Sequence, residues 1–281
     1  MQIGGSFLMD AVLVNRLAAA VRAADPDRYF AALFAPAAQR PYLFAFYAFN
    51  AELARVAETV REPMLGEIRL EWWRETVEAA SKGSARNHDV ARGLVSLFAE
   101  RNLAVTDFEA LIAARAFDSS PDHLADFAAL ENYVVSTSGA VMRLAARILA
   151  GDPAPGLEQG LREAGLAYGL TGLLRALPFH SGRHKLYLPL DLLSALELTP
   201  DAFFHLAKND PRLEAVMRQV SLKARDAFLA ARKAPKPGAA LAAILPASLV
   251  PVYLRRLGSG KDVPIHRRQM ALLSAAMRKR L

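Results

Sequence analysis

The chain has 281 residues, contains no cysteine, and carries 35 Lys and Arg against 28 Asp and Glu, which gives a formal net charge of +7. Without cysteine it has no disulfides, thiolate metal sites or cysteine nucleophiles, which fits a reducing compartment. The positive charge favours anionic partners such as diphosphates or acidic lipid surfaces, and because no recognised nucleic-acid-binding motif accompanies it, we expect no nucleic-acid partner.

Apolar residues recur at spacings of three and four through most of the chain, which predicts an all-α protein. In chain order, the expected helices cover residues 9–24, 26–34, 39–61, 63–82, 86–101, 105–117, 122–150, 155–179, 200–207, 210–233, 238–256 and 264–280. The expected start signals are Asp25-Pro26, Ser84, Thr106 and Thr199-Pro200. No linker is long or polar enough to indicate a second domain, so we expect one domain over residues 1–281.

Two segments bear on where the protein resides. The N-terminal segment has no cationic start and reaches an acidic residue at Asp10, so it is a poor secretory signal and a cytoplasmic protein is expected. Residues 238–254 form the most apolar window, but they include Pro246 and Pro251 and fall short of the roughly 20 apolar residues that a membrane-spanning helix needs. We expect a kinked core helix there, with a membrane-docking element as the alternative.

Two of the expected helices carry small residues along one face, at steps of four, three and four. On the helix that begins near Arg40, the positions of this face are Tyr47, Ala51, Ala54 and Glu58, of which the two alanines are small. On the helix that ends near residue 179, they are Gly165, Gly169, Gly172 and Ala176. Each glycine inside a helix costs about 1 kcal/mol relative to alanine, so a compensating reason is expected. Two reasons remain open: the close approach of two helix backbones, or a groove that leaves room for a ligand.

Between Glu163 and Asp191 the chain has no acidic residue, and cations cluster at the expected end of the second helix. The cluster consists of His180, Arg183, His184 and Lys185. Cations near a helix C-terminus are favourable by a few tenths to about 1 kcal/mol, which is one explanation. A second is an anion pocket that binds a phosphate or lipid headgroup directly, together with Arg175. A third is a metal role for the two histidines, for which no clear third ligand is present.

These segments resemble the squalene/phytoene synthase family, the head-to-head trans-prenyl diphosphate synthases, and the match spans most of the chain. The first motif of that family has an Arg, an aromatic-rich run and aspartates four apart, and its counterpart here is RPYLFAFYAFNAELARVAE, residues 40–58. Its second motif is matched by Leu170, Thr171, Leu174, Arg175, Gly182, Arg183, Tyr187, Leu188 and Pro189. Trp73 and the segment from Tyr133 to Gly139 match as well. The resemblance implies a single-domain isoprenoid synthase-type helical bundle with a central cavity.

The departures from the family pattern fall on the metal-binding positions. Active members use both aspartate pairs to hold magnesium ions, which bind the departing diphosphate and need clustered oxygen ligands. The counterparts of those aspartates here are Ala54, Glu58, Ala176 and His180. One carboxylate of four survives, so the resemblance implies a protein without metal, cofactor or catalysis.

The resemblance implies that the remaining motif residues belong to a diphosphate-binding site. The resemblance assigns ligand or diphosphate binding to Arg40, Tyr47, Arg175, Arg183, Lys185 and Tyr187. It assigns the lining of the cavity to Ala51, Gly139, Gly165, Gly169 and Gly172. For Arg40 and Tyr47, a packing or ion-pair role is the alternative. The aromatic run of the first motif is core by default, although an apolar tunnel for a prenyl or acyl chain would use the same residues.

Two phrases resemble one branch of the superfamily, formed by the mitochondrial complex I (NADH dehydrogenase) assembly factor and its bacterial relatives. They are AFNAELARV and LRALPFHSGRHKLYLPLD. This resemblance implies a synthase fold that is kept for binding an isoprenoid, a lipid or a protein partner, with a role in assembly of a respiratory complex. The alternative is an active, Mg-dependent head-to-head prenyltransferase that holds metal through Glu58 with Glu52 or Glu71.

A third class of function is a module that binds lipid surfaces. The C-terminal cations favour either a solvated face or peripheral contact with the inner face of a membrane. These cations are Arg267, Arg268, Arg278, Lys279 and Arg280.

Overall fold

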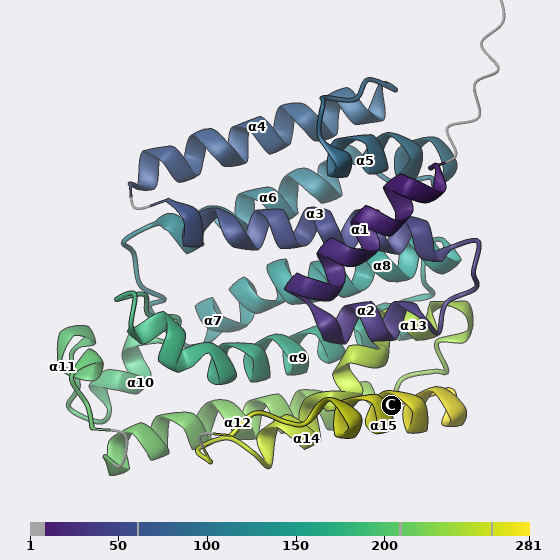
Figure 1. Ribbon diagram of the computed structural model, residues 1–281. Helices are drawn as coiled ribbons and strands as arrows, with labels where there is room; N and C mark the ends of the chain where they lie inside the picture. The colour runs from purple at the N-terminus through teal and green to yellow at the C-terminus, as the bar shows by residue number, and fades with distance from the viewer. Residues whose placement is uncertain (1–8, 61, 208–209, 260) are drawn as a thin grey trace, which may run out of the picture. The chain divides into compact units, whose positions relative to one another are not determined.

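The computed structural model describes residues 9–60, 62–207, 210–259 and 261–281 (Figure 1). Helices make up the regular structure of these ranges, and no strand occurs in them, so the all-α prediction is confirmed. Most of the N-terminal segment assessed as a secretory signal lies outside the described residues, as does the last residue of the helix expected over 39–61.

The chain divides into two compact units. Unit 1 consists of Met1–Ser120, Arg143–Pro153 and Gly238–Ala243. Unit 2 consists of Pro121–Met142, Ala154–Pro237 and Ile244–Leu281. The expectation of one domain over the whole chain stays a prediction.

Unit 1 is built around α3, against which α1, α5 and α6 pack. Its complete helices are α1 (Ala11–Ala24), α2 (Pro26–Ala32), α3 (Arg40–Thr59), α4 (Pro63–Ser81), α5 (Asp89–Glu100) and α6 (Val105–Ser119), followed by the short η2 (Gly238–Ala240). The aromatic run of α3 forms the core: the ring of Phe49 lies 5.4 Å from that of Trp73 and 5.7 Å from that of Phe108. The default assignment of this run to the core is therefore confirmed.

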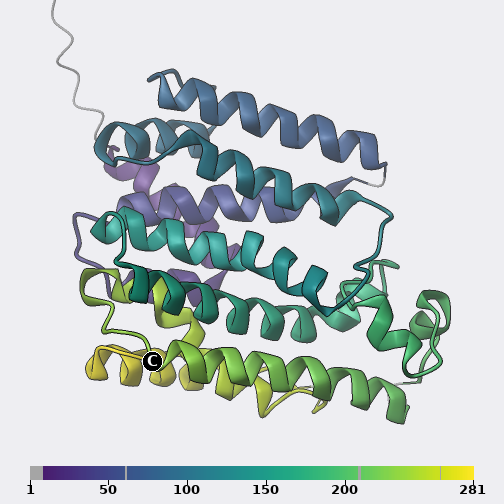
Figure 2. The same cartoon turned by 180° about the vertical axis from the view of Figure 1, so that it is seen from behind.

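Unit 2 contains α7 (Phe127–Val134), η1 (Val135–Gly139), α9 (Pro155–Ser181), α10 (Leu190–Ser194), α11 (Pro200–Phe204), α12 (Pro211–Ala231), η3 (Leu245–Leu249), α14 (Val250–Leu254) and α15 (Ile265–Arg278). The long helices α9 and α12 run side by side in opposite directions (Figures 1 and 2). Gly160 near the start of α9 lies against Ala234, just after the end of α12. Two further helices, α8 (Ala140–Ala150) and α13 (Leu241–Ile244), contain the chain positions at which the units divide.

Helix starts were predicted correctly where a capping residue directly precedes a proline in the sequence. Asp25 accepts a hydrogen bond from the backbone N–H of Arg28, and Thr199 accepts one from that of Ala202. The start signals at Ser84 and Thr106 are wrong, because α5 is capped by His88 and α6 begins at Val105 without a side-chain cap. A capping residue needs backbone N–H groups to satisfy, and the turn before α5 continues past Ser84.

Two long predicted helices are interrupted. The segment expected over 122–150 becomes helical only at Phe127, after the Asp126 cap, and passes through the π-helical turn η1 before α8. The segment expected over 238–256 is divided into η2, α13, η3 and α14, because Pro246 and Pro251 lack the N–H group that a continuous helix uses. Most of that segment is buried, as expected of core. The small helix α10 was missed.

None of the helices in the described ranges is long and apolar enough to cross a membrane.

Candidate functional site

The stripe of small residues on α9 is tightly packed over its first half. A Cβ atom added at Gly165 would lie 2.4 Å from the Cα atom of Gly139, and one added at Gly169 would lie 2.5 Å from Cγ1 of Val134. These distances are far shorter than van der Waals contact, so α9 can approach the segment formed by α7 and η1 only where it lacks side chains. Close backbone packing, the first of the two explanations, therefore accounts for Gly165 and Gly169, whereas a Cβ atom added at Gly139 would find its nearest neighbour at 3.7 Å.

Gly172 has a different environment. Among the described residues outside the neighbouring turns of α9, no atom lies within 4 Å of a Cβ atom built at this position. Packing gives no reason for glycine here, and the role of Gly172 in lining a cavity stays a prediction. The same holds for Ala51 on α3, which is half-buried, as are the motif positions Ala54 and Ala176.

Arg175 is held against the ring of a buried tyrosine. Its guanidinium carbon lies 3.6 Å from the centroid of the Tyr253 ring, in the range of a cation–π contact. One of its nitrogen atoms lies 3.5 Å from a carboxylate oxygen of Asp262, whose side chain is 78% exposed. Because exposed ion pairs contribute about 0–1 kcal/mol, the stacking on Tyr253 is the stronger of these two contacts.

The predicted cation cluster gathers around Tyr187. His180 lies in the last turn of α9 and not beyond the helix, because α9 continues through Pro178 to Ser181. The Tyr187 ring is 4.6 Å from the ring of His180 and 5.4 Å from that of Tyr133, and Nζ of Lys185 lies 5.6 Å from it. Tyr187 itself is buried, at 8% exposed. A histidine, a lysine and two tyrosines thus share one cluster.

The two other cations of the loop lie against aromatic rings as well. The guanidinium of Arg183 lies 5.7 Å from the ring of Phe179, and the ring of His184 lies 5.1 Å from that of Phe204. His184 has a left-handed backbone with a φ of 53°, at the turn where the chain leaves α9. An anion pocket formed by this cluster together with Arg175 stays a prediction.

On α3, both predicted ligand residues have structural contacts. Arg40 donates a hydrogen bond from Nε to the carbonyl oxygen of Ala35 at 2.9 Å, which fixes the turn before the helix. Tyr47 is only 2% exposed, and burial raises the pKa of its hydroxyl above the usual value, although the nearby Arg28 acts in the opposite direction. Both residues thus have structural contacts, and their assignment to ligand binding stays a prediction.

The side chains do not fit the magnesium cluster that the resemblance implies for active members. In the described part of the chain, no group of three or more His, Asp or Glu side chains could hold a metal ion. Glu58 lies exposed in the last turn of α3, and Glu52 on the same helix pairs with Arg55 at 3.6 Å. Since Mg²⁺ needs several hard oxygen ligands at once, the two carboxylates of α3, with none on the second half of α9, are insufficient.

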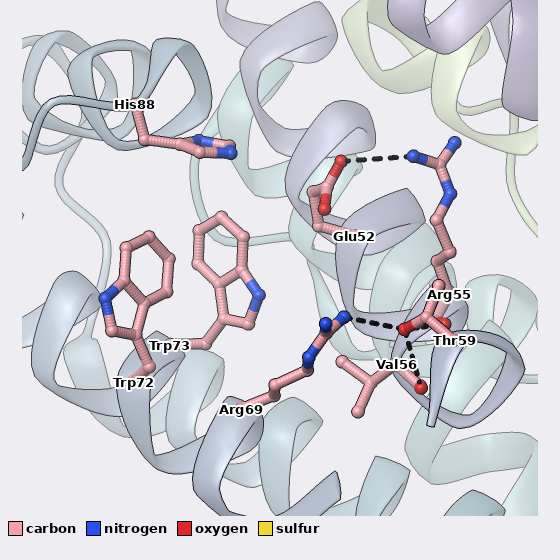
Figure 3. A pocket seen from close by; sticks show the side chains of 8 residues that line it. All are labelled: Glu52, Arg55, Val56, Thr59, Arg69, Trp72, Trp73 and His88. Atoms are coloured by element: carbon pink, nitrogen blue, oxygen red, sulfur yellow. Dashed lines mark hydrogen bonds and ion pairs between the residues drawn. The ribbon is translucent and has the colours of Figure 1, made fainter. Parts of the chain in front are cut away.

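A small pocket in unit 1 combines aromatic and charged side chains (Figure 3). It has a volume of about 180 Å³ and is lined by Glu52, Arg55, Val56, Thr59, Arg69, Trp72, Trp73 and His88. Figure 3 shows the indole and imidazole rings on one side and the Arg69–Thr59 hydrogen bond, 2.7 Å long, on the other. Trp73, which the resemblance had matched to the family, is buried at 4% exposed, while His88 and Arg69 carried no sequence signal for a pocket.

A cavity of about 760 Å³ lies within unit 2, between α9, α11, α12 and the chain that follows α14. Its walls are mainly apolar and include Leu174, Leu177, Phe203, Phe204, Leu213 and Met217. Arg175, Arg256, Lys261 and Asp262 supply the charged groups. Cavities of roughly 300–1,000 Å³ with apolar walls and a few polar groups are typical of ligand sites. Of these residues only Leu174 and Arg175 belong to the second motif, and only Arg175 was expected to bind a ligand.

Comparisons with known proteins agree over most of the chain. Residues 21–274 match the family model described as squalene/phytoene synthase. Human NADH dehydrogenase (ubiquinone) complex I, assembly factor 6, is 30% identical over 172 residues, which cover 61% of this chain and 51% of that protein. Presqualene diphosphate synthase of Rhodopseudomonas palustris is 30% identical over 190 residues, which cover 66% of this chain and 63% of that protein.

A solved structure shares the fold. A dehydrosqualene synthase in complex with a ligand matches with a TM-score of 0.75 at 16% sequence identity, over 95% of this chain and 96% of that chain. The predicted isoprenoid synthase-type helical fold is thereby confirmed. The matched region spans about half the length of the human assembly factor, at 51%.

Proposed function

The chain belongs to the squalene/phytoene synthase family, whose model matches residues 21–274, and we propose that it is a non-catalytic member that binds an isoprenoid or lipid ligand. The observation that carries this proposal is the replacement of three of the four metal-binding carboxylates, by Ala54, Ala176 and His180. A departing diphosphate develops negative charge that a single glutamate cannot meet with the usual metal cluster. The contact between the rings of His180 and Tyr187, whose centroids lie 4.6 Å apart, supports a packing role at that position.

Pyrophosphate release measures the catalytic part of this proposal. The purified chain is incubated with farnesyl or geranylgeranyl diphosphate and Mg²⁺, beside an active dehydrosqualene synthase as positive control. We expect no release above that of the Glu58→Ala variant. Metal-dependent release that Glu58→Ala abolishes would contradict the proposal.

Metal-dependent pyrophosphate release would instead support the second candidate function, an Mg-dependent head-to-head prenyltransferase. The likeness to presqualene diphosphate synthase, at 30% identity over 66% of this chain, favours it. Glu52 and Glu71 are the further carboxylates considered for metal binding, and they pair with Arg55 and Arg74 at 3.6 and 2.6 Å. Metal binding would have to break these exposed pairs, which contribute little stability.

We also propose that the protein supports assembly of a respiratory complex. The support is its likeness to proteins named as complex I assembly factor 6, the human one among them. Deletion of its gene in the source organism is expected to lower the amount of assembled complex I on native gels. The Glu58→Ala chain should restore assembly as well as the unaltered chain does. Normal complex I in the deletion strain would contradict this role.

We also propose that the protein is cytoplasmic and makes peripheral contact with the inner face of the membrane through α15. Residues 263–281 contain no Asp or Glu and five Lys and Arg. On α15 an apolar row at spacings of three and four is exposed, formed by Met270, Leu273 and Met277. Exposed apolar side chains beside cations suit an anionic lipid surface. We expect sedimentation with phosphatidylglycerol vesicles at low salt that high salt weakens; no sedimentation at low salt would contradict it.

A further inference from the structure

The cavity in unit 2 lies on the face of α9 opposite the metal-binding positions of the family motif. Leu174, Leu177, Pro178 and Ser181 line it, at the spacing of one helix face. An α-helix turns by about 100° per residue, so the centre of this set lies roughly 150° around the axis from the centre of the row formed by Gly172, Ala176 and His180. The cavity therefore lies on another face of α9 than Ala176 and His180, although Arg175 of the second motif reaches its lining.

The walls of the cavity suit an apolar chain. Phe203 and Phe204 on α11 and Leu213 and Met217 on α12 face Leu174 and its neighbours on α9. Phe203 is buried, and Leu213 and Met217 are half-buried although their helix is otherwise solvated on its outer side. Burial of an apolar ligand surface is favourable by about 25 cal/mol per Å². The volume of about 760 Å³ is that of a ligand site and not of a packing defect.

The charged groups of the same cavity suit an anion. Its lining includes three cations, Arg175, Arg256 and Lys261, and a single carboxylate, Asp262. The Arg175 guanidinium carbon lies 3.6 Å from the centroid of the Tyr253 ring, which places this cation at the wall of the cavity. The pair with Asp262 is long, at 3.5 Å, and exposed. Charge-assisted hydrogen bonds from arginine to phosphate are stronger than such a pair, so a phosphate can displace Asp262.

We propose that this cavity binds a single-chain amphiphile, with its apolar chain between α9, α11 and α12 and its phosphate group at Arg175, Arg256 and Lys261. This inference rests on the proposed ligand-binding function. It adds the location of the site and the chemical class of the ligand. An isoprenoid phosphate and a lysophospholipid share this chemistry. Either would enter from the side of the cavity that carries the cations.

Binding to the purified full-length chain tests the proposal, with isothermal titration calorimetry as the measurement. The probes are geranylgeranyl monophosphate, oleoyl lysophosphatidic acid and, as the uncharged match, geranylgeraniol. We expect at least one phosphorylated probe to bind, at least tenfold more tightly than the alcohol. Preference for one of the two phosphorylated probes identifies the source of the ligand. Equal affinity for the alcohol and its phosphate, or no binding of either phosphorylated probe, would overturn the proposal.

Variants locate the bound probe. Leu213→Trp should fill the cavity and weaken binding at least tenfold, whereas Leu222→Trp, the same substitution at an exposed position of α12, should not. Met217→Trp serves as a second filling variant if Leu213→Trp lowers the melting temperature. Arg256→Gln should weaken binding of the phosphorylated probe and leave that of the alcohol unchanged. Unchanged binding by both filling variants would contradict the proposal that the probe binds in this cavity.

One further variant separates failure of this inference from failure of the proposed function. Gly172→Leu places a side chain on the opposite face of α9, where the described residues leave room. We expect it to bind the probes as the unaltered chain does. Loss of binding in Gly172→Leu, with normal binding in Leu213→Trp, would move the ligand to the motif face. The proposed ligand-binding function would then stand, and the cavity would not be its site.

Discussion

The helices α3 and α9 carry the counterparts of the two family motifs, yet their surroundings differ. On α3 an unbroken run of residues from Tyr42 to Asn50 is buried, so that part of the helix is core on all sides. On α9 one face contacts η1 through Gly165 and Gly169, and the opposite face opens to the cavity at Leu174 and Leu177. The central part of α3 is therefore core of unit 1, whereas α9 has one packed face and one face that lines a cavity.

The largest expected effect is at the packed face of α9. Gly165→Ala would place a Cβ atom 2.4 Å from the Cα atom of Gly139, and backbone cannot yield as a flexible side chain does. Overpacking of this kind typically costs about 1–3 kcal/mol, so the free energy of unfolding should fall by that amount. Urea denaturation followed by circular dichroism measures it. An unchanged midpoint would show that α9 and η1 are less tightly packed than described.

The buried face of α3 predicts an alkaline effect. The pKa of Tyr47 is raised in the folded protein, above the ordinary value of 10.0 that applies to the unfolded chain. Below pH 10 both states keep the proton and the full stability is present. As the pH rises above 10, only the unfolded state loses the proton, so the free energy of unfolding falls by about 1.4 kcal/mol per pH unit.

Tyr47→Phe should remove this part of the decline. Urea midpoints at pH 9, 10 and 11 measure it, with the difference between the two chains as the quantity of interest. Tyr42 also has a raised pKa, mainly through burial, and is present in both chains, so its contribution cancels in the difference. Parallel declines for Tyr47→Phe and the unaltered chain would mean that Tyr47 is not deeply buried.

A smaller effect of opposite sign is expected farther along the same stripe of α9. Gly172→Ala should raise the free energy of unfolding by about 0.5–1 kcal/mol, because alanine is the better helix former and its Cβ atom meets no described neighbour within 4 Å. The melting temperature by calorimetry measures the gain. A loss of stability would place a contact at Gly172 and remove the contrast with Gly165.

The smallest effect is expected at the polar end of α3. Glu52→Gln breaks an exposed ion pair with Arg55, whose atoms lie 3.6 Å apart, so the free energy of unfolding should change by about 0.5 kcal/mol or less. The same urea titration, repeated at high salt, measures it. A loss above about 2 kcal/mol would mean that the pocket in Figure 3 depends on this carboxylate.

Sequence reasoning worked best for local features. It located most helices within a few residues, and it identified the caps at Asp25 and Thr199, because a capping bond joins residues two or three positions apart. It was weakest where a local rule competes with packing. Helix α9 continues through Pro178 to Ser181, two residues past its expected end, and η1 interrupts a segment that was expected to be one helix. Neither outcome can be derived from neighbouring residues alone.

The sequence by itself determined the helical class, the family and the residues Ala54, Glu58, Ala176 and His180, at which the resemblance places the metal-binding aspartates of active members. These properties depend on residue identity and spacing, which are fixed along the chain. Only the tertiary structure decided that Gly165 meets Gly139, that Arg175 stacks on Tyr253, and that α9, α11 and α12 enclose a cavity. Such contacts join residues far apart in the chain, and their geometry follows from how whole helices pack, which no local pattern encodes.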